Sequence, residues 1–368
     1  MARFQHISGK RRVFVKLRQS GTISRAELAR QCSLTRPAVS AIIDELMNDG
    51  IVRELGPGHS TGGKPPIMLE FKPASRCAIG IDLGGARRIE GVLCDLGCGI
   101  IAGDSLAYEN NFDSILQTIF SLVRRLVGVT PGGIPVAGVG IAVSAIVGED
   151  NDVIGSSTLD IIRKDLARKL ESLCGLPVRM ERRPNAAALA EALFGAGQNH
   201  DKLLYLTSGR GIGAGMVIGG EIFRGCQGFA GELGRLVLPG GGQLEEMARP
   251  TGLPLKYSEK NGKNVNFEEF MGLYLRQDET AVALVRENAR QLAYAAQVAA
   301  NIFDPNAIVL GGDVLEFGDI HFNTFKDALS RELEAWRFGH APDVLRSAFG
   351  RRGVAVGGAQ LILDELIF

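Results

Sequence analysis

Three segments of this sequence share one pattern, a short apolar run that ends in glycines. They are Ala78 to Gly85, Leu203 to Gly215, and Ala307 to Asp313. An apolar run of this length between turn residues is typical of a buried strand. A glycine turn after a strand lets backbone N–H groups approach a phosphate or another ligand. The repetition predicts two related α/β lobes around a cleft, with a ligand at the carboxyl ends of the strands.

The length and composition agree with a folded protein that has many turns. A chain of 368 residues is long enough for two or three domains. Its 45% hydrophobic and 22% charged residues exclude a disordered or collagen-like chain. The 48 glycines, against a single tryptophan, favour an α/β protein with tight turns.

The sequence contains no pattern typical of a secreted or membrane protein. The first 20 residues are basic and lack the apolar centre of a signal peptide. The uncharged stretch from Leu126 to Gly148 is interrupted by Pro131 and Pro135, which leaves an apolar run too short to cross a bilayer. The six cysteines are scattered, without the spacing of a zinc site. We therefore expect a cytoplasmic protein with reduced thiols, no metal and no membrane partner.

Charge separates the chain into two parts. Met1 to Lys72 holds 12 Lys and Arg residues and six Asp and Glu residues, while the remainder holds 29 and 35. The first part therefore carries a net charge of +6 and the rest −6. A basic segment on an acidic body is typical of a nucleic-acid-binding module, although a solvated basic face would show the same excess.

The basic segment has two helices at the spacing of a helix-turn-helix. Ser24 and Glu27 form a capping box that predicts the start of the first helix, after a turn. A three-residue turn separates it from a second helix, which begins at Thr35. The second helix has an apolar stripe at helical spacing, formed by Val39, Ile42, Ile43 and Leu46.

Two alternating strands and a glycine-rich loop follow, as in a winged helix-turn-helix. The strands are expected at Ile51–Leu55 and Ile67–Phe71, with a wing between them. We predict that DNA contacts come from the start of the second helix and from the wing, namely from Thr35, Arg36, Ser40, His59 and Lys64. A small dimerisation domain could share the capping box. The turn spacing, the basic excess and the wing together favour a double-stranded DNA operator as the partner.

Together these motifs resemble the ROK family of regulators, which join a winged helix-turn-helix to a body similar to actin-type and hexokinase-type sugar kinases. The resemblance covers nearly the whole chain. Besides the strand-to-glycine turns, it rests on Asn185 to Glu191, Gly231 to Gly234, and Ala355 to Ala359. It implies an N-terminal winged helix-turn-helix followed by a two-lobed, ribonuclease H-like α/β core.

The resemblance also implies a division of the chain and an assembly. We expect a winged helix-turn-helix at 1–72, a first lobe at 73–190 completed by a C-terminal helix at 350–368, and a second lobe at 191–349. A helix is expected at Thr280 to Phe303, where alanines at helical spacing suit core packing. Since winged helix-turn-helix domains usually bind paired half-sites, we expect a homodimer or a dimer of dimers.

The family's catalytic position argues against phosphoryl transfer. Kinases of the family have an Asp two residues before the Asn of the Asn-Ala-Ala-Ala stretch, where it accepts the proton of the sugar hydroxyl. Arg183 stands there in this chain, and a guanidinium cannot act as that base. Both phosphate loops also lack the family's hydroxyls, with Ala86 and Arg210 in their place. We interpret Asp82, Gly84, Gly85, Gly211 and Gly213 as vestigial phosphate loops, and expect no catalysis and no cofactor.

The family's zinc site is missing as well. Arg235 stands at the family's His position, and no cysteine follows it. Glu232 and Glu245 match carboxylates that contact sugar in relatives, while Thr158, next to Asp160, replaces an Asn. The expected effector-binding residues are Thr158, Asp160, Arg183, Glu232, Arg235 and Glu245.

Two interpretations of this set stay open. Arginine forks suit a carboxylate or phosphate, which favours a sugar acid, a sugar phosphate or another small anion as effector. Alternatively, the arginines pair with Glu232 and Glu245, and the cleft is vestigial. In either case we expect a sequence-specific transcriptional regulator that acts as a repressor. The alternative function is an ATP-dependent sugar kinase with a fused DNA-binding domain, which the glycine loops favour and Arg183 disfavours.

Overall fold

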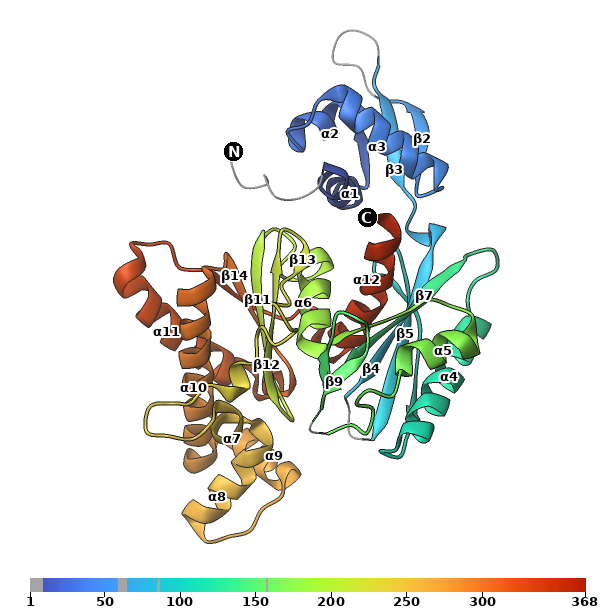
Figure 1. The fold of residues 1–368 in the computed structure, drawn as a ribbon. Coiled ribbons are helices and arrows are strands. Elements are labelled where there is room, and N and C mark those ends of the chain that lie inside the picture. Colours follow the sequence, from blue (N-terminus) through green and yellow to red (C-terminus); the bar gives the residue numbers. More distant parts are fainter. Residues whose placement is uncertain (1–8, 59–64, 85–86, 157) are drawn as a thin grey trace. The chain divides into compact units, whose positions relative to one another are not determined.

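The computed structural model describes residues 9–58, 65–84, 87–156 and 158–368. The chain divides into two compact units, formed by Met1–Ala186 with Val354–Phe368 and by Ala187–Gly353 (Figure 1). Each unit contains a five-stranded mixed sheet covered by helices, and the first unit also contains the N-terminal helices with their own small sheet. None of the helices in the described ranges is long and apolar enough to span a bilayer.

The N-terminal part of the first unit is a winged helix-turn-helix. Its elements are α1 (Gly9–Ser20), β1 (Thr22–Ser24), α2 (Arg25–Gln31), α3 (Arg36–Asn48), β2 (Val52–Pro57) and β3 (Ile67–Phe71). The strand order is β1-β3-β2, with both pairs antiparallel. We expected only a turn before Ser24, and this was wrong, because β1 pairs with β3. A three-residue strand is too short for an alternating pattern to reveal it.

The two helix starts confirm the sequence analysis only in part. The Ser24 hydroxyl accepts a hydrogen bond from the Glu27 N–H at 3.2 Å, and Thr35 caps α3 by accepting from the Ala38 N–H at 3.4 Å. A capping box also requires the Glu27 carboxylate to accept from the Ser24 N–H. This part of the prediction was wrong, since the carboxylate instead accepts from Arg30 Nε at 2.9 Å. A guanidinium three residues along a helix is a charge-assisted partner that competes well with a backbone N–H.

The first lobe contains a sheet in the order β10-β7-β4-β5-β6. Its strands are β4 (Cys77–Leu83), β5 (Arg88–Asp95), β6 (Ile100–Ala107), β7 (Val136–Val143) and β10 (Val178–Arg182), with a short hairpin of β8 (Ile146–Val147) and β9 (Val153–Gly155). Its helices are α4 (Phe112–Gly128), α5 (Leu166–Cys174), the start of α6 (Arg183–Phe194) and α12 (Gly353–Ile367). Apolar side chains of β4 and β7 pack against α4 and α5 in one buried core.

The C-terminal helix α12 lies directly on this sheet because glycines remove the intervening side chains. A Cβ added to Gly80 would collide with the Ala355 carbonyl oxygen, and one added to Gly140 would collide with the Gly358 carbonyl oxygen. Both glycines lie in the middle of central strands. Glycine in a strand interior is typical of such a close backbone approach.

The end of α12 also contacts α1 of the winged helix-turn-helix. Arg11, which is 5% exposed, forms an ion pair with Asp364. Its guanidinium lies 4.7 Å from the centre of the Phe368 ring, which packs edge to face on Phe14 at 5.7 Å. A cation over an aromatic ring and an edge-to-face ring pair are both favourable contacts. Helix α1 is therefore packed against the C-terminal end of α12.

The second unit has a sheet in the order β13-β12-β11-β14-β15. Its strands are β11 (Lys202–Ser208), β12 (Ile212–Ile218), β13 (Glu221–Ile222), β14 (Ala307–Gly311) and β15 (Asp343–Arg346). Its helices are α7 (Leu244–Ala248), α8 (Leu253–Asn261), α9 (Phe267–Leu275), α10 (Glu279–Phe303) and α11 (Gly318–Arg337). The core lies between the sheet and the α10–α11 pair. The helix expected at Thr280 to Phe303 is confirmed as α10.

Candidate functional site

Three strands of the first lobe end side by side, and each is followed by a residue of the candidate site. Gly84 follows β4, Ser144 follows β7 and Arg183 follows β10. Since β4 and β10 both pair in parallel with β7, their carboxyl ends meet at one edge of the sheet. A Cβ added to Gly84 would lie 2.5 Å from both Arg183 Nε and Ser144 Oγ. A residue without a side chain is therefore needed here to let Arg183 cross the turn.

Arg183 forms a two-point ion pair with Asp82, a residue of β4. Its Nε donates to Asp82 Oδ1 at 2.6 Å and its Nη2 donates to Oδ2 at 2.9 Å. The Asp82 side chain is 9% exposed and that of Arg183 is 31% exposed. Parallel guanidinium–carboxylate bonds of this kind are among the strongest that side chains form. Neither interpretation from the sequence named Asp82 as the partner.

This pair does not fit a magnesium–nucleotide site. Both Asp82 oxygens accept from the guanidinium, so the carboxylate of the first phosphate loop is already neutralised by a fixed cation. A divalent ion would have to displace it, since magnesium requires free oxygen ligands. Gly85, the other predicted residue of this loop, lies outside the described residues.

Thr158 lies in a turn that its neighbours hold mainly through the backbone. The Ser156 hydroxyl donates to the Ser144 carbonyl oxygen at 3.2 Å and accepts from the Thr158 N–H at 3.3 Å. Asn110 donates through Nδ2 to the Thr158 carbonyl oxygen at 2.8 Å. The Thr158 side chain is exposed. Sequence reasoning missed Ser144, Ser156 and Asn110, because their roles come from contacts between strand ends.

Asp160, close to Thr158, already has a cationic partner. It forms an exposed ion pair at 2.6 Å with Lys164, four residues further on. Its N–H also donates to Asn110 Oδ1 at 3.4 Å. The first lobe therefore brings together Asp82, Gly84 and Arg183, and it holds Thr158 and Asp160 in a separate turn tied to the same strand ends through Ser144.

In the second unit, Glu245 holds the second glycine loop. It lies in the first turn of α7, and its Oε2 accepts from the Ile212 N–H at 2.9 Å. A Cβ added to Gly211 would lie 2.9 Å from the same oxygen, so the loop and the carboxylate are in close contact. Gly213 lies buried within β12. This backbone bond gives Glu245 a structural role that the sequence did not suggest.

Glu232 precedes a short 3-10 turn at Leu233–Arg235, and Arg235 is its last residue. The exposed Arg235 donates through Nη1 to Gln243 Oε1 at 3.3 Å, and Glu232 is half-buried. Zinc requires Cys, His or carboxylate donors, which an arginine and a glutamine do not supply. Within the described ranges, no three His, Cys, Asp or Glu side chains lie together as a metal site would require. These residues do not fit the family's zinc ion.

The start of α3 presents the residues expected to contact DNA. Arg36 is exposed, Ser40 is half-buried, and Thr35 caps the helix. Arg25 of α2 donates to the Ser40 carbonyl oxygen at 3.2 Å and forms an ion pair with Asp44 at 2.8 Å, which fixes the crossing of the two helices. The two predicted wing contacts, His59 and Lys64, lie outside the described residues.

Comparison with family models gives two matches. A model described as the ROK family matches residues 78–365, and one described as winged helix-turn-helix DNA-binding matches residues 17–53. Together they account for both parts of the chain that the sequence analysis distinguished. The expected fold class is therefore confirmed.

Regulators are among the similar proteins over the full length. The xylose repressor of Bacillus subtilis is 26% identical over 359 residues, covering 95% of this chain and 93% of the repressor. A putative xylose repressor of Caldicellulosiruptor sp. is 30% identical over 372 residues, covering 94% and 93%. Both alignments include the winged helix-turn-helix.

Among solved structures, one resembles nearly the whole chain and another resembles about three quarters of it. A ROK family transcriptional regulator, described as a homologue of the E. coli MLC protein, superposes with a TM-score of 0.81 at 21% identity, covering 97% of this chain and 96% of that one. A ROK family glucokinase from Streptomyces griseus, in complex with glucose and AMPPNP, superposes with a TM-score of 0.68 at 27% identity. The glucokinase covers 77% of this chain and 98% of its own. The regulator therefore shares the fold of nearly the whole chain, while the glucokinase matches about three quarters of it.

Proposed function

This chain belongs to the ROK family, and from that premise we propose that it is a transcriptional repressor that binds operator DNA through its winged helix-turn-helix. The observation that carries the proposal is the start of α3, where Arg36 is exposed beside a capped helix N-terminus. Such a recognition helix contacts base edges and phosphates in the major groove. The net charge of +6 on residues 1–72 and the full-length likeness to xylose repressors support the same function.

We propose further that the body binds a small molecule without phosphorylating it. Arg183 at the catalytic position cannot accept a proton, and it occupies the Asp82 carboxylate. Loss of catalysis in this chain is supported by these two facts together, since each removes a different part of the phosphoryl-transfer machinery. The body would act as a cytoplasmic sensor that changes the affinity of the protein for DNA.

The proposed effector is an acidic sugar derivative or another small anion. An anion that binds Arg183 would compete with Asp82, and the guanidinium is exposed enough to be approached. Thr158, Asp160, Glu232, Arg235 and Glu245 complete the proposed effector set. Glu245 and Asp160 already have partners, so each would contribute by holding the loop of its own unit.

The DNA-binding proposal is tested with the purified full chain and the DNA upstream of its own gene. We expect fluorescence anisotropy to show binding that is at least about 100-fold tighter than to unrelated DNA of the same length at physiological salt. The logarithm of the affinity should fall linearly with that of the salt concentration. Equal affinity for both DNAs would contradict a sequence-specific repressor.

The effector proposal is tested by thermal shift against neutral sugars, sugar phosphates and sugar acids, with Arg183→Ala alongside. A ligand that binds the native state raises the melting temperature by mass action. We expect stabilisation by an anion that the variant abolishes. A coupled assay with ATP should show no turnover. Turnover that depends on Asp82 would instead favour a sugar kinase with a fused DNA-binding domain.

A further inference from the structure

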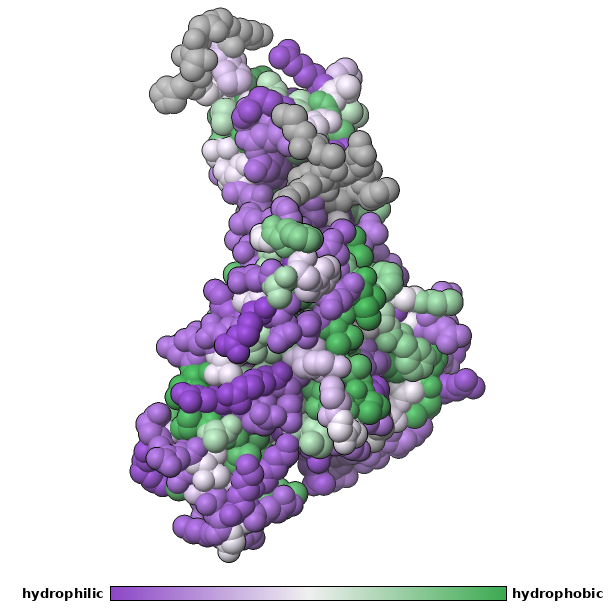
Figure 2. All heavy atoms as spheres, turned by 90° about the vertical axis from the view of Figure 1, so that its left-hand side faces the viewer, coloured by the Kyte–Doolittle hydropathy of each residue, from purple (hydrophilic) through white to green (hydrophobic). Residues whose placement is uncertain are grey.

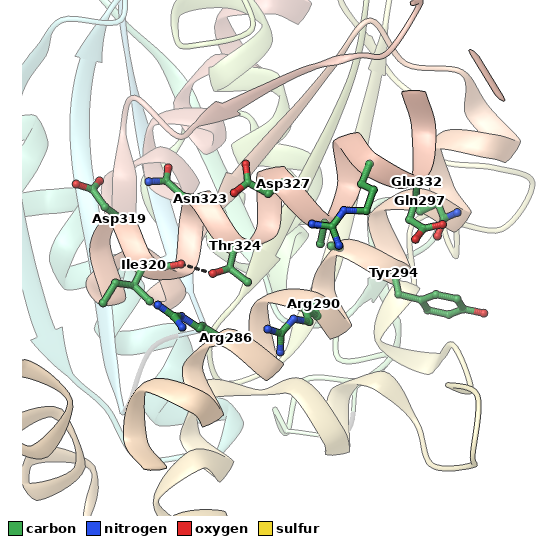
Figure 3. A pocket seen from close by; sticks show the side chains of 13 residues that line it. Arg286, Arg290, Tyr294, Gln297, Asp319, Ile320, Asn323, Thr324, Asp327 and Glu332 are labelled. Atoms are coloured by element: carbon green, nitrogen blue, oxygen red, sulfur yellow. Dashed lines mark hydrogen bonds between the residues drawn. The ribbon is translucent and has the colours of Figure 1, made fainter. Parts of the chain in front are cut away.

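Charged side chains dominate much of the surface of this chain. Figure 2 shows that hydrophilic side chains cover most of the face that it draws. In the second unit, a groove of about 970 Å³ is lined by α10 and α11, and Figure 3 shows arginines and carboxylates along it. These carboxylates would repel phosphates, so the groove does not suit DNA. A charged cluster that bears on DNA lies instead in the winged helix-turn-helix, around Arg25.

Arg25 joins three elements of the winged helix-turn-helix. It is the first residue of α2, and its Nη1 donates to the Ser40 carbonyl oxygen of α3 at 3.2 Å. Its Nη2 lies 2.8 Å from Asp44 Oδ1, also in α3, and 3.4 Å from Glu54 Oε1 in β2. A guanidinium has five N–H donors in a fixed plane, so one side chain can hold a helix and a strand at once.

The contact with β2 lies where this strand of the wing changes direction. In the pairing of β2 with β3, one extra residue lies between Glu54 and Gly56. Such a β-bulge bends its strand and increases the local twist. Met68 of β3 pairs with Gly56 on one side and with Ser24 of β1 on the other. Since Ser24 directly precedes Arg25, the arginine leaves the sheet at the level of the bulge.

The direction of the wing strands matters because DNA contacts are expected from two places, the start of α3 and the wing. Both can reach one DNA site together only when the strands leave the sheet at a fixed angle to α3. Fixing that angle before binding reduces the entropy that is lost on binding. The side chains of Asp44 and Glu54 are 62% and 38% exposed, so their ion pairs with Arg25 contribute little to stability. We therefore expect their effect in DNA recognition.

We propose that Arg25 is a positioning residue for DNA recognition, which holds β2 to α3 through Glu54 and Asp44. The recognition helix and the wing then meet the operator in one orientation. Unrelated DNA is bound through its phosphates, without base contacts that fix a register, so its binding does not depend on that orientation. This inference rests on the proposed DNA-binding function and names a residue that gives it specificity.

The sign of a single charge removal tests the inference. Glu54→Ala removes a carboxylate from the DNA-binding part, so electrostatics alone would tighten its binding to any DNA. We expect the opposite for the operator, an affinity lower by at least about threefold, with no loss of affinity for unrelated DNA. Fluorescence anisotropy of the full chain at fixed salt measures both. The control is Glu70→Ala, which removes the same charge from β3, where Glu70 pairs with Arg53, and it should not weaken operator binding.

A double-variant cycle shows whether Glu54 acts through Arg25. In a chain that already carries Arg25→Ala, Glu54→Ala should no longer lower the operator affinity, because the ion pair is already absent. An equal loss with and without Arg25 would overturn the inference, as would a Glu54→Ala variant that binds the operator like Glu70→Ala. Asp44→Ala, tested in the same cycle, decides the question if Glu54→Ala shows no thermal unfolding transition.

Failure of the proposed function is recognised from the unchanged protein alone. If it binds operator DNA and unrelated DNA equally, there is no specificity for Arg25 to support, and the inference falls together with the repressor. If the unchanged protein prefers the operator, only the comparison of Glu54→Ala with Glu70→Ala and the cycle with Arg25→Ala bear on the inference.

Discussion

Arg183 and Asp82 are 101 positions apart in the chain, yet two hydrogen bonds join them across an intervening strand. Arg183 follows β10, Asp82 lies in β4, and β7 runs between them. Neighbouring strands are about 4.8 Å apart, so the arginine must cross about 10 Å between strand axes. Only a long side chain can do so, and it needs Gly84 beneath it.

The first prediction concerns this ion pair. Replacing Arg183 by Ala leaves a largely buried carboxylate without its partner, and we expect the free energy of unfolding to fall by about 1–3 kcal/mol, with the lower part of the range reflecting the partial exposure of Arg183. Urea unfolding measures this free energy. Arg179→Ala is a matched control on β10, the strand directly before Arg183, because Arg179 pairs with Glu365 at the surface and should contribute less than about 1 kcal/mol. Equal losses for both variants would show that Arg183 is an ordinary surface residue.

The second prediction concerns DNA. Arg36→Ala removes an exposed cation at the start of the recognition helix, so we expect the affinity for operator DNA to fall about tenfold or more, with the unfolding free energy unchanged. Fluorescence anisotropy at fixed salt measures the affinity. Arg276→Ala makes the same charge change in the second unit, at an exposed position, and should leave the affinity unchanged. If both variants bind DNA as the unchanged protein does, α3 does not approach the operator with Arg36.

The third prediction concerns the contact between α1 and the end of α12. Arg11→Ala removes a buried guanidinium that contacts both Asp364 and the Phe368 ring. We expect a loss of about 2 kcal/mol in the free energy of unfolding. Lys10 lies on the same helix as Arg11 and pairs with Glu45 of α3 at the surface, so Lys10→Ala should cost less than about 1 kcal/mol. Similar values for Arg11 and Lys10 would argue against a stabilising role for α12 in the DNA-binding part.

The fourth prediction concerns pH and a buried histidine. His321 is 1% exposed, it hydrogen-bonds with Asn288 at 2.9 Å, and burial lowers its pKa from 6.5 to about 4. The folded state thus binds a proton less readily than the unfolded state, so stability is lost as pH falls below 6.5 and the loss continues down to about 4. Between pH 7 and 5 this amounts to about 2 kcal/mol.

Substitution isolates this contribution. His321→Gln removes the titrating group, so the unchanged protein should lose about 2 kcal/mol more than the variant between pH 7 and 5, measured by urea unfolding at each pH. His340→Gln, at an exposed position, serves as the control and should follow the unchanged protein. If the free energy of unfolding of the unchanged protein and of His321→Gln changed with pH in parallel, the imidazole would bind a proton as readily in the folded state as in the unfolded state.

Much of the fold could be predicted because its signals are local. The strands before the glycine turns, the stripe of α3 and the alanine-rich α10 follow from periodicity within one element. The short strand β1 could not be found in this way, since its stability comes from pairing with β3, more than 40 positions away. The return bond of Glu27 failed for a different and local reason, because Arg30, three positions further along the helix, took the carboxylate.

The sequence could nominate candidate site residues, and that set stays a prediction, but it did not reveal which of their charged groups pair with one another. The position of Arg183 in the chain places an arginine where kinases of the family have their catalytic Asp, and its chemistry predicted that it would pair with an anion. Which anion it found depends on the order β10-β7-β4, which sets the strand ends next to each other. Glu245 is a second case, as its partner is a backbone N–H of β12 rather than an arginine.

By itself, the sequence determined the helices of the DNA-binding part, the strand-to-glycine turns, the family, and the presence of an arginine at the family's catalytic position, because each depends on residue type and spacing along a short stretch of chain. Tertiary structure alone decided the partner of Arg183, the packing of α12 on α1, and the backbone partner of Glu245. The physical reason is that a charged side chain takes its partner from whatever the fold brings within a few ångströms. That neighbour is set by sheet order and helix packing, which no local pattern encodes.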